Sequence, residues 1–229
     1  MKYNHIERID RANPTRLVTA IMAEKFPSQP YAAAHDYFEA YRAHIARAWS
    51  SVDVSSVGRA AALIRECLER DGIVYACGNG GSAAIANHLL CDFQKGIQTG
   101  TTRKPRVVSL SSHLELITAI ANDISYDDVF SYQLRTMARP GDLLITISSS
   151  GNSENIVRAA RWAKDNRLPT IALVGFSGGR SATIADVTVH VDAENYGIVE
   201  DVHQSMMHLF AQYLRQSWMT PADIEKSKF

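Results

Sequence analysis

The sequence predicts an α/β protein, a three-layer doubly wound sandwich built around a five-stranded parallel sheet. Five short apolar runs rich in β-branched residues alternate with helical patterns along the chain, which is the order that parallel β-α-β units require. The runs are almost continuously apolar, as strands covered by helices on both faces are. The length of 229 residues and the ordinary composition fit one large domain.

Two helices are expected ahead of the sheet, after a mostly polar arm. Residues 1–30 are interrupted by three prolines, and we interpret them as an N-terminal arm, part of a helical extension, with the domain spanning residues 31–229. Apolar residues then recur at helical spacing from Phe38 to Trp49. A second helical pattern follows the SSVDVSS stretch and ends at Gly72.

The remaining chain alternates between strands and helices. The predicted strands are 72–78, 106–111, 142–148, 170–176 and 187–192. The predicted helices are 82–95, 113–121 with 127–138, 153–166 and about 198–217. Ligands of such sheets bind beyond the carboxyl ends of the strands. Three glycine- or serine-rich turns lie there: GNGGS after the first strand, SSSGNS after the third and GFSGGR after the fourth.

The SSSGNS turn has the chemistry of a phosphate site. It carries four hydroxyls, those of Ser148, Ser149, Ser150 and Ser153. Hydroxyls beside the free N–H groups of a helix N-terminus favour an anion with several acceptor oxygens. The turn lacks the lysine of a P-loop, and GNGGS lacks the dinucleotide-binding spacing and its later acidic residue. A capped loop without a ligand is the alternative, and two polar turns at one sheet edge favour the ligand.

Two predicted helices carry histidines with acids at meaningful spacing. His88 and Asp92 are four residues apart and share a helix face, which fits either a simple hydrogen-bonded pair or a metal or base site. Glu200 and His208 are eight residues apart, about 12 Å along a regular helix. One ion therefore binds both only if the helix begins after Glu200 or if a partner subunit supplies one of them.

Charge and cysteine content exclude several classes. Lysine plus arginine and aspartate plus glutamate both number 24, which gives no support to binding of nucleic acid or of a membrane surface. The three cysteines, Cys67, Cys77 and Cys91, show no C-x-x-C spacing, so a reducing compartment is expected. No signal peptide and no run of about 18 apolar residues is evident, and we expect a cytoplasmic protein.

Four segments together resemble a known family. CGNGGS, AIANDISYDDVF, ISSSGNS and VEDVHQSMMH, in this chain's order and spacing, resemble the SIS (sugar isomerase) domain family over about residues 35–215, and within it the phosphoheptose isomerases. The resemblance implies the SIS fold and a homotetramer with active sites between subunits. It implies that a phosphosugar is bound by Asn79, Gly80, Gly81, Ser82, Asn122, Asp123, Ser148, Ser149, Ser150 and Ser153.

The resemblance also implies a metal and catalytic set, formed by His88, Asp92, Glu200 and His208. The family has glutamate at the position of Asp92 and glutamine at that of Glu200. These side chains would still suit zinc or a similar divalent ion. The implied reaction converts sedoheptulose 7-phosphate to glycero-manno-heptose 7-phosphate through an enediol, for activated-heptose biosynthesis, with Asp92 as the base, Glu200 as the second candidate and His208 as the acid/base partner.

Three other functions stay open on the sequence. The two departures in the metal set are compatible with an isomerase for a different phosphosugar. A non-catalytic SIS tetramer acting as an assembly factor is less consistent with the acid at Asp92 and with His208. A phosphosugar-sensing regulator would need a DNA-binding domain, for which residues 1–30 are too short.

Overall fold

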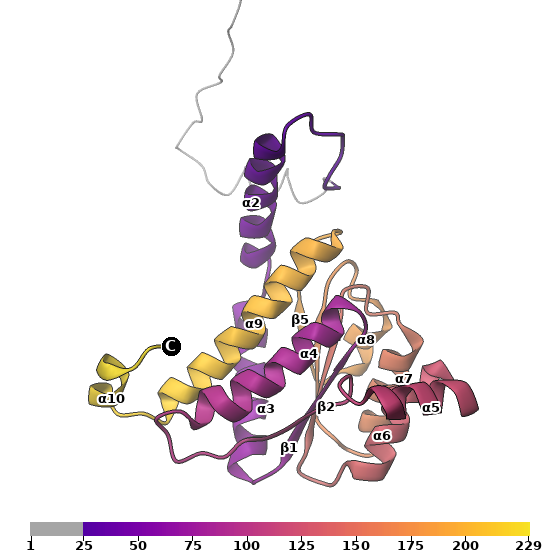
Figure 1. Ribbon diagram of the computed structural model, residues 1–229, viewed down its shortest axis with the longest axis vertical. Coiled ribbons are helices and arrows are strands. Elements are labelled where there is room, and N and C mark those ends of the chain that lie inside the picture. Colours follow the sequence, from indigo (N-terminus) through magenta and orange to yellow (C-terminus); the bar gives the residue numbers. More distant parts are fainter. Residues whose placement is uncertain (1–24) are drawn as a thin grey trace, which may run out of the picture.

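The computed structural model describes residues 25–229 and confirms the predicted fold class (Figure 1). All strand pairs are parallel, and the strand order is β2-β1-β3-β4-β5. The strands are β1 (Ile73–Gly78), β2 (Arg106–Ser109), β3 (Leu143–Ser148), β4 (Thr170–Val174) and β5 (Val187–His190). The order reverses between β1 and β3, and the crevice at such a switch point is where doubly wound sheets bind ligands.

Helices cover both faces of the sheet, because alternate strand residues point to opposite sides. Val74 and Ala76 face one apolar core, whereas Tyr75 and Cys77 face the other. The first core lies under α2 (Ala34–Ser50), α3 (Val54–Glu69), α4 (Gly81–Cys91) and α9 (Tyr196–Ser217). The second lies under α5 (Leu114–Asp123), α6 (Val129–Met137) and α7 (Glu154–Asp165). Figure 1 shows α4 and α9 side by side on one face.

In the N-terminal region, one helix boundary differs from its prediction. The predicted arm falls almost entirely outside the described residues. Helix α3 begins at Val54, three residues before the predicted start, because the Asp53 carboxylate accepts hydrogen bonds from the N–H groups of Ser55 and Ser56. Two six-residue helices, α8 (Gly179–Ile184) and α10 (Pro221–Lys226), were not predicted.

The helix predicted over 82–95 is two segments. Helix α4 ends at Cys91 and continues as a π-helical turn, η1 (Asp92–Ile97). Such turns insert an extra residue into a helix, often at functional sites. Asp92 is the first residue of η1, and Phe93 and Ile97 are buried in the core. Within residues 25–229, no helix has the length and apolar character needed to span a bilayer.

Candidate active site

A small cavity lies at the carboxyl ends of β1 and β3, at the switch point of the sheet. We call it the serine cavity. Its volume is about 130 Å³. Its lining is Asn79, Ser82, Ile147, Ser148, Ser149, Ser150, Ser153, Tyr196 and Glu200. The hydroxyl of Ser149 is buried and has no hydrogen-bond partner among the described residues, so the cavity wall holds an unused polar group. The structure therefore brings the serines of two predicted turns together in one place.

The side chain of Asn79 is fixed by two residues that the sequence did not single out. Asn79 and Asn155 exchange two amide hydrogen bonds, of 2.9 and 3.0 Å, and the Tyr126 hydroxyl donates to Asn79 Oδ1 at 3.1 Å. Asn155 is fully buried at the start of α7. A polar residue on the apolar face of the predicted helix 153–166 was the signal that could have revealed it.

Glu200 reaches the serine cavity from α9. This helix begins at Tyr196, after Asn195 accepts a hydrogen bond from the Ile198 N–H, so Glu200 lies inside the helix rather than before it. Its carboxylate packs against Gly81, the first residue of α4, where any side chain would overlap it. Burial, and secondarily the charge of Asp201, raises the pKa of the Glu200 carboxyl.

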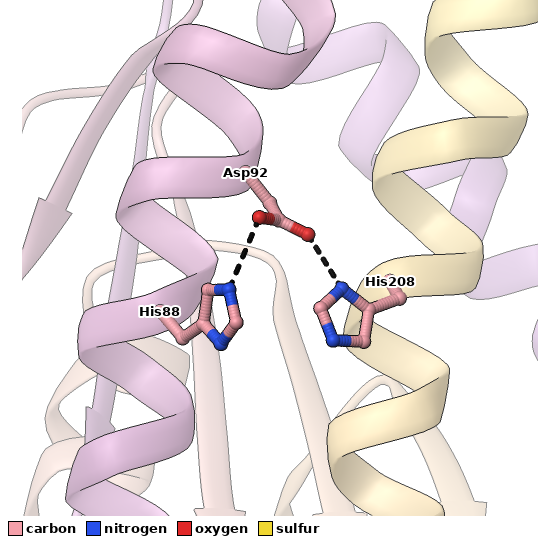
Figure 2. A group of neighbouring side chains, drawn as sticks. All are labelled: His88, Asp92 and His208. Atoms are coloured by element: carbon pink, nitrogen blue, oxygen red, sulfur yellow. Dashed lines mark hydrogen bonds and ion pairs between the residues drawn. The ribbon is translucent and has the colours of Figure 1, made fainter. Parts of the chain in front are cut away.

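His88, Asp92 and His208 meet between α4 and α9 (Figure 2). His208 Nδ1 lies 2.6 Å from Asp92 Oδ2, and His88 Nε2 lies 3.3 Å from Asp92 Oδ1. Each of the three residues offers a ligand atom within 4.8 Å of the others. We call these three residues the acid–histidine group. It forms within a single chain, so His208 needs no partner subunit to reach Asp92.

Gln204 joins the two imidazoles, a role that the sequence did not indicate. Its side-chain nitrogen lies 3.0 Å from both His88 Nδ1 and His208 Nε2. An amide N–H₂ can donate to both ring nitrogens, which leaves the opposite nitrogen of each ring to donate to Asp92. The spacing of four residues between Gln204 and His208 on one helix face was the available signal.

The acid–histidine group fits a divalent metal ion. Two imidazoles and one carboxylate are typical zinc ligands, and three protein ligands leave an open position, as in catalytic zinc sites. Glu200, expected as a fourth ligand, is not part of the group in the described chain and lines the serine cavity instead.

The predicted substrate residues Asn122 and Asp123 lie elsewhere in this single chain. Both are exposed at the end of α5, where the Asn122 amide donates to Asp123 Oδ1 at 2.7 Å. Neither lines the serine cavity. The same segment reaches the cavity through Tyr126 and its bond to Asn79.

The fold and these motifs define a family. A family model described as SIS domain matches residues 36–175, and the chain belongs to this family. It is 36% identical over 162 residues to a phosphoheptose isomerase of Colwellia psychrerythraea, covering 69% of this chain and 82% of that protein. It is 34% identical over 177 residues to a probable phosphoheptose isomerase of Thermoplasma acidophilum, covering 76% and 94%.

A solved structure agrees with these relatives. The phosphoheptose isomerase of Neisseria gonorrhoeae superposes with a TM-score of 0.74 at 32% identity, covering 80% of this chain and 100% of that one. Within the SIS family, the chain is thus similar in sequence and in structure to phosphoheptose isomerases, which are intramolecular oxidoreductases.

Proposed function

We propose that this protein is a phosphosugar aldose–ketose isomerase that converts sedoheptulose 7-phosphate to glycero-manno-heptose 7-phosphate, supplying activated-heptose biosynthesis. The observation that carries the proposal is the serine cavity, in which the serines of two loops share one small space with the Glu200 carboxylate. The similarity to proteins named phosphoheptose isomerase supports the choice of a seven-carbon substrate.

The serines would bind the phosphate. A phosphate monoester offers several acceptor oxygens, and the hydroxyls of Ser82, Ser148, Ser149, Ser150 and Ser153 can all donate. The unpartnered hydroxyl of Ser149 is a donor that such a ligand would satisfy. The lining contains no lysine or arginine, so recognition would rely on hydrogen bonds rather than on a cationic side chain.

The reaction moves a proton between C1 and C2 through an enediol. It needs a base for the carbon-bound proton and a second group for protons on the oxygens. The placement of Glu200 inside the serine cavity favours it as the base, and its raised pKa brings it nearer to the working pH. Asp92 accepts from both imidazoles, which suits it to orient His208, the acid/base partner. Asp92 remains the alternative base.

His88, Asp92 and His208 would hold a divalent metal, which we propose to be zinc. Bound there, zinc would polarise the sugar carbonyl and stabilise negative charge on its oxygen. The chain's own task is to keep the three ligands together, with Gln204 holding both rings in place.

We further propose a homotetramer whose active sites combine residues of different subunits. In one chain His88 lies six residues beyond Ser82, about 9 Å along a helix, so the acid–histidine group is offset from the serine cavity. A larger groove of about 640 Å³ borders His208 on the outer side of α9 and includes Leu209, Tyr213 and Phe229. These exposed apolar side chains, and Phe38 on α2, are available to neighbouring subunits.

The test is an isomerisation assay on C5–C7 ketose phosphates, with and without chelator. We expect turnover of sedoheptulose 7-phosphate, lost with chelator and restored by zinc. Glu200→Gln should lower kcat at least about a hundredfold, because an amide cannot accept the proton. Phosphosugar binding without turnover would overturn the proposal in favour of a sensor. Turnover only of another ketose phosphate would assign a different substrate.

A further inference from the structure

The turn after β4 is the third glycine-rich turn of the sequence. The proposed function assigns it no part in phosphate binding or in proton transfer. We call residues 175–181 the backing turn and residues 148–153 the serine loop. The backing turn does not line the serine cavity. It packs instead against the far side of the serine loop, where the two are joined by a series of hydrogen bonds.

Backbone N–H groups of the backing turn bind carbonyl oxygens of the serine loop. The Gly175 N–H donates to the Ser149 carbonyl at 2.9 Å, and the Ser181 N–H donates to the Gly151 carbonyl at 2.9 Å. A side chain on Gly151, which has a φ of 63°, would overlap the Gly178 carbonyl. The backbones of the two segments therefore approach each other at a distance that only glycine, without a side chain, permits.

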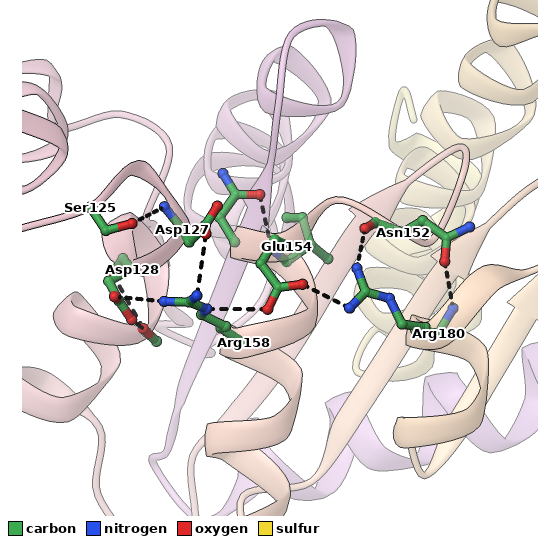
Figure 3. Close-up of polar contacts among 10 residues, drawn as sticks. Ser125, Asp127, Asp128, Asn152, Glu154, Arg158 and Arg180 are labelled. Carbon is green, nitrogen blue, oxygen red and sulfur yellow. Dashed lines mark hydrogen bonds and ion pairs between the residues drawn. The ribbon is translucent and has the colours of Figure 1, made fainter.

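Arg180 supplies the next contact in the series (Figure 3). Its Nη2 donates to the Asn152 carbonyl at 2.6 Å, and its backbone N–H donates to Asn152 Oδ1 at 3.1 Å. Its Nη1 donates to Glu154 Oε2 at 2.7 Å. Arg180 thus joins the serine loop to the first turn of α7 in a planar, multidentate geometry that lysine cannot reproduce.

These contacts have a consequence for an anionic ligand. Carbonyl oxygens are acceptors and would repel a phosphate, whereas hydroxyls can donate to it. The backing turn binds the carbonyls of Ser149, Gly151 and Asn152, so these acceptors are directed away from the serine cavity. The cavity wall is left to the serine hydroxyls.

We propose that Arg180 is a positioning residue for phosphate binding, acting through Asn152 to hold the serine loop in its donor-presenting conformation. This inference rests on the proposed function, since it assigns the serine cavity to a phosphate group. Arg180 does not line the cavity, so it would act on a bound phosphate only through the serine loop. Its loss should therefore weaken recognition of the phosphate more than it slows the chemical step.

The experiment compares Arg180→Ala with wild type by calorimetric binding of inorganic phosphate and by the kinetics of ketose phosphate turnover. We expect the Kd for phosphate and the KM to rise on the order of tenfold, because the serine loop loses one charge-assisted hydrogen bond. The kcat should change less than about threefold. Arg180→Lys should recover part of the affinity, since one of the two side-chain contacts can be remade.

Arg158→Ala is the matched control. Arg158 binds the other Glu154 oxygen, together with Asp127 and Asp128, but donates to no residue of the serine loop (Figure 3). The Arg158→Ala variant loses an arginine–glutamate ion pair with Glu154, as Arg180→Ala does. We expect the phosphate Kd of Arg158→Ala to stay within about twofold of wild type.

Two results would overturn the inference: an unchanged phosphate Kd in Arg180→Ala, or equal losses in Arg180→Ala and Arg158→Ala. A folded Arg180→Ala, verified by circular dichroism, makes either result decisive. If wild type binds phosphate yet turns over no sugar phosphate, the isomerase proposal fails, while the phosphate comparison still decides the role of Arg180.

Discussion

Gly81 and Glu200 form a contact in which the smallest residue makes room for a candidate base. The Glu200 carboxylate occupies the space that a Cβ on Gly81 would need. Gly81 is the first residue of α4, and its backbone is not in the left-handed region, so alanine is compatible with the helix. The glycine is therefore required by the carboxylate beside it rather than by the backbone.

Gly81→Ala should inactivate the protein without unfolding it. The methyl group would push the flexible end of Glu200 aside, and a displacement of about 1 Å can cost on the order of a hundredfold in rate. We expect kcat to fall by that order while the melting temperature changes little. Gly58→Ala in α3, where a Cβ meets nothing within 4 Å, is the control and should keep full activity. Equal turnover in both variants would contradict the placement of Glu200.

Asp92 is the only carboxylate that contacts both imidazoles of the acid–histidine group within the described chain. Asp92→Asn should weaken zinc binding by at least about a hundredfold, the upper end for outer-shell partners of a metal site. Competition with a chromogenic chelator measures this loss. Asp165→Asn, an exposed change at the end of α7, should leave zinc binding unaltered. Unchanged affinity in Asp92→Asn would remove Asp92 from the metal set.

The serine loop and the backing turn make a joint that depends on glycine. Gly151→Ala combines a strained φ of 63° with overlap against the Gly178 carbonyl. Because that neighbour is backbone, the two segments must separate. We expect a loss of about 1–3 kcal/mol in unfolding free energy, measured by urea denaturation, and a weaker phosphate affinity. Wild-type phosphate affinity in a destabilised Gly151→Ala protein would show that the loop works without this packing.

The strands were predictable because β-branched runs such as DLLITIS signal burial on both faces, and β3 is buried at every position. Helices α8 and α10 were missed because six residues are too few to show a period. The π-helical turn was missed because it is defined by its backbone hydrogen-bond pattern, which amino-acid composition does not reveal. The serines were predicted from turn chemistry, whereas Asn155 and Gln204 were not, since their roles come from partners distant in sequence.

Acid stability of the whole molecule depends on a histidine within the α9 core. His203 is fully buried, and neither ring nitrogen has a well-formed hydrogen bond in the described chain. Burial lowers its pKa to about 4, with the charge of His190 adding to the shift and the Val174 carbonyl opposing it. An unfolded histidine has an ordinary pKa of 6.5. Between these values the unfolded chain binds the extra proton, so stability falls as pH falls.

The expected loss is about 3 kcal/mol as pH drops from 6.5 to 4. His203→Gln should remove most of this slope, whatever its effect on stability at neutral pH. Urea unfolding at several pH values measures it, with the exposed His35→Gln as control. Glu200 contributes to the pH dependence of stability with the opposite sign, because a raised carboxyl pKa favours the folded state as pH falls. A His203→Gln slope equal to that of wild type would contradict the assignment.

The acid–histidine group includes Asp92 and His208, which are 116 positions apart, and the bond between them joins η1 to α9. Contacts this distant in sequence close a long loop, which carries a larger entropic cost than contacts between neighbouring elements. The serine loop, by contrast, is held by neighbouring strands β3 and β4. In the proposed site, turnover therefore depends on the docking of α9, which carries Glu200 and His208, whereas the serine hydroxyls for the phosphate are held mainly by the sheet. A variant that loosens α9 should stop turning over its substrate while still holding phosphate, so that partial unfolding separates recognition from reaction.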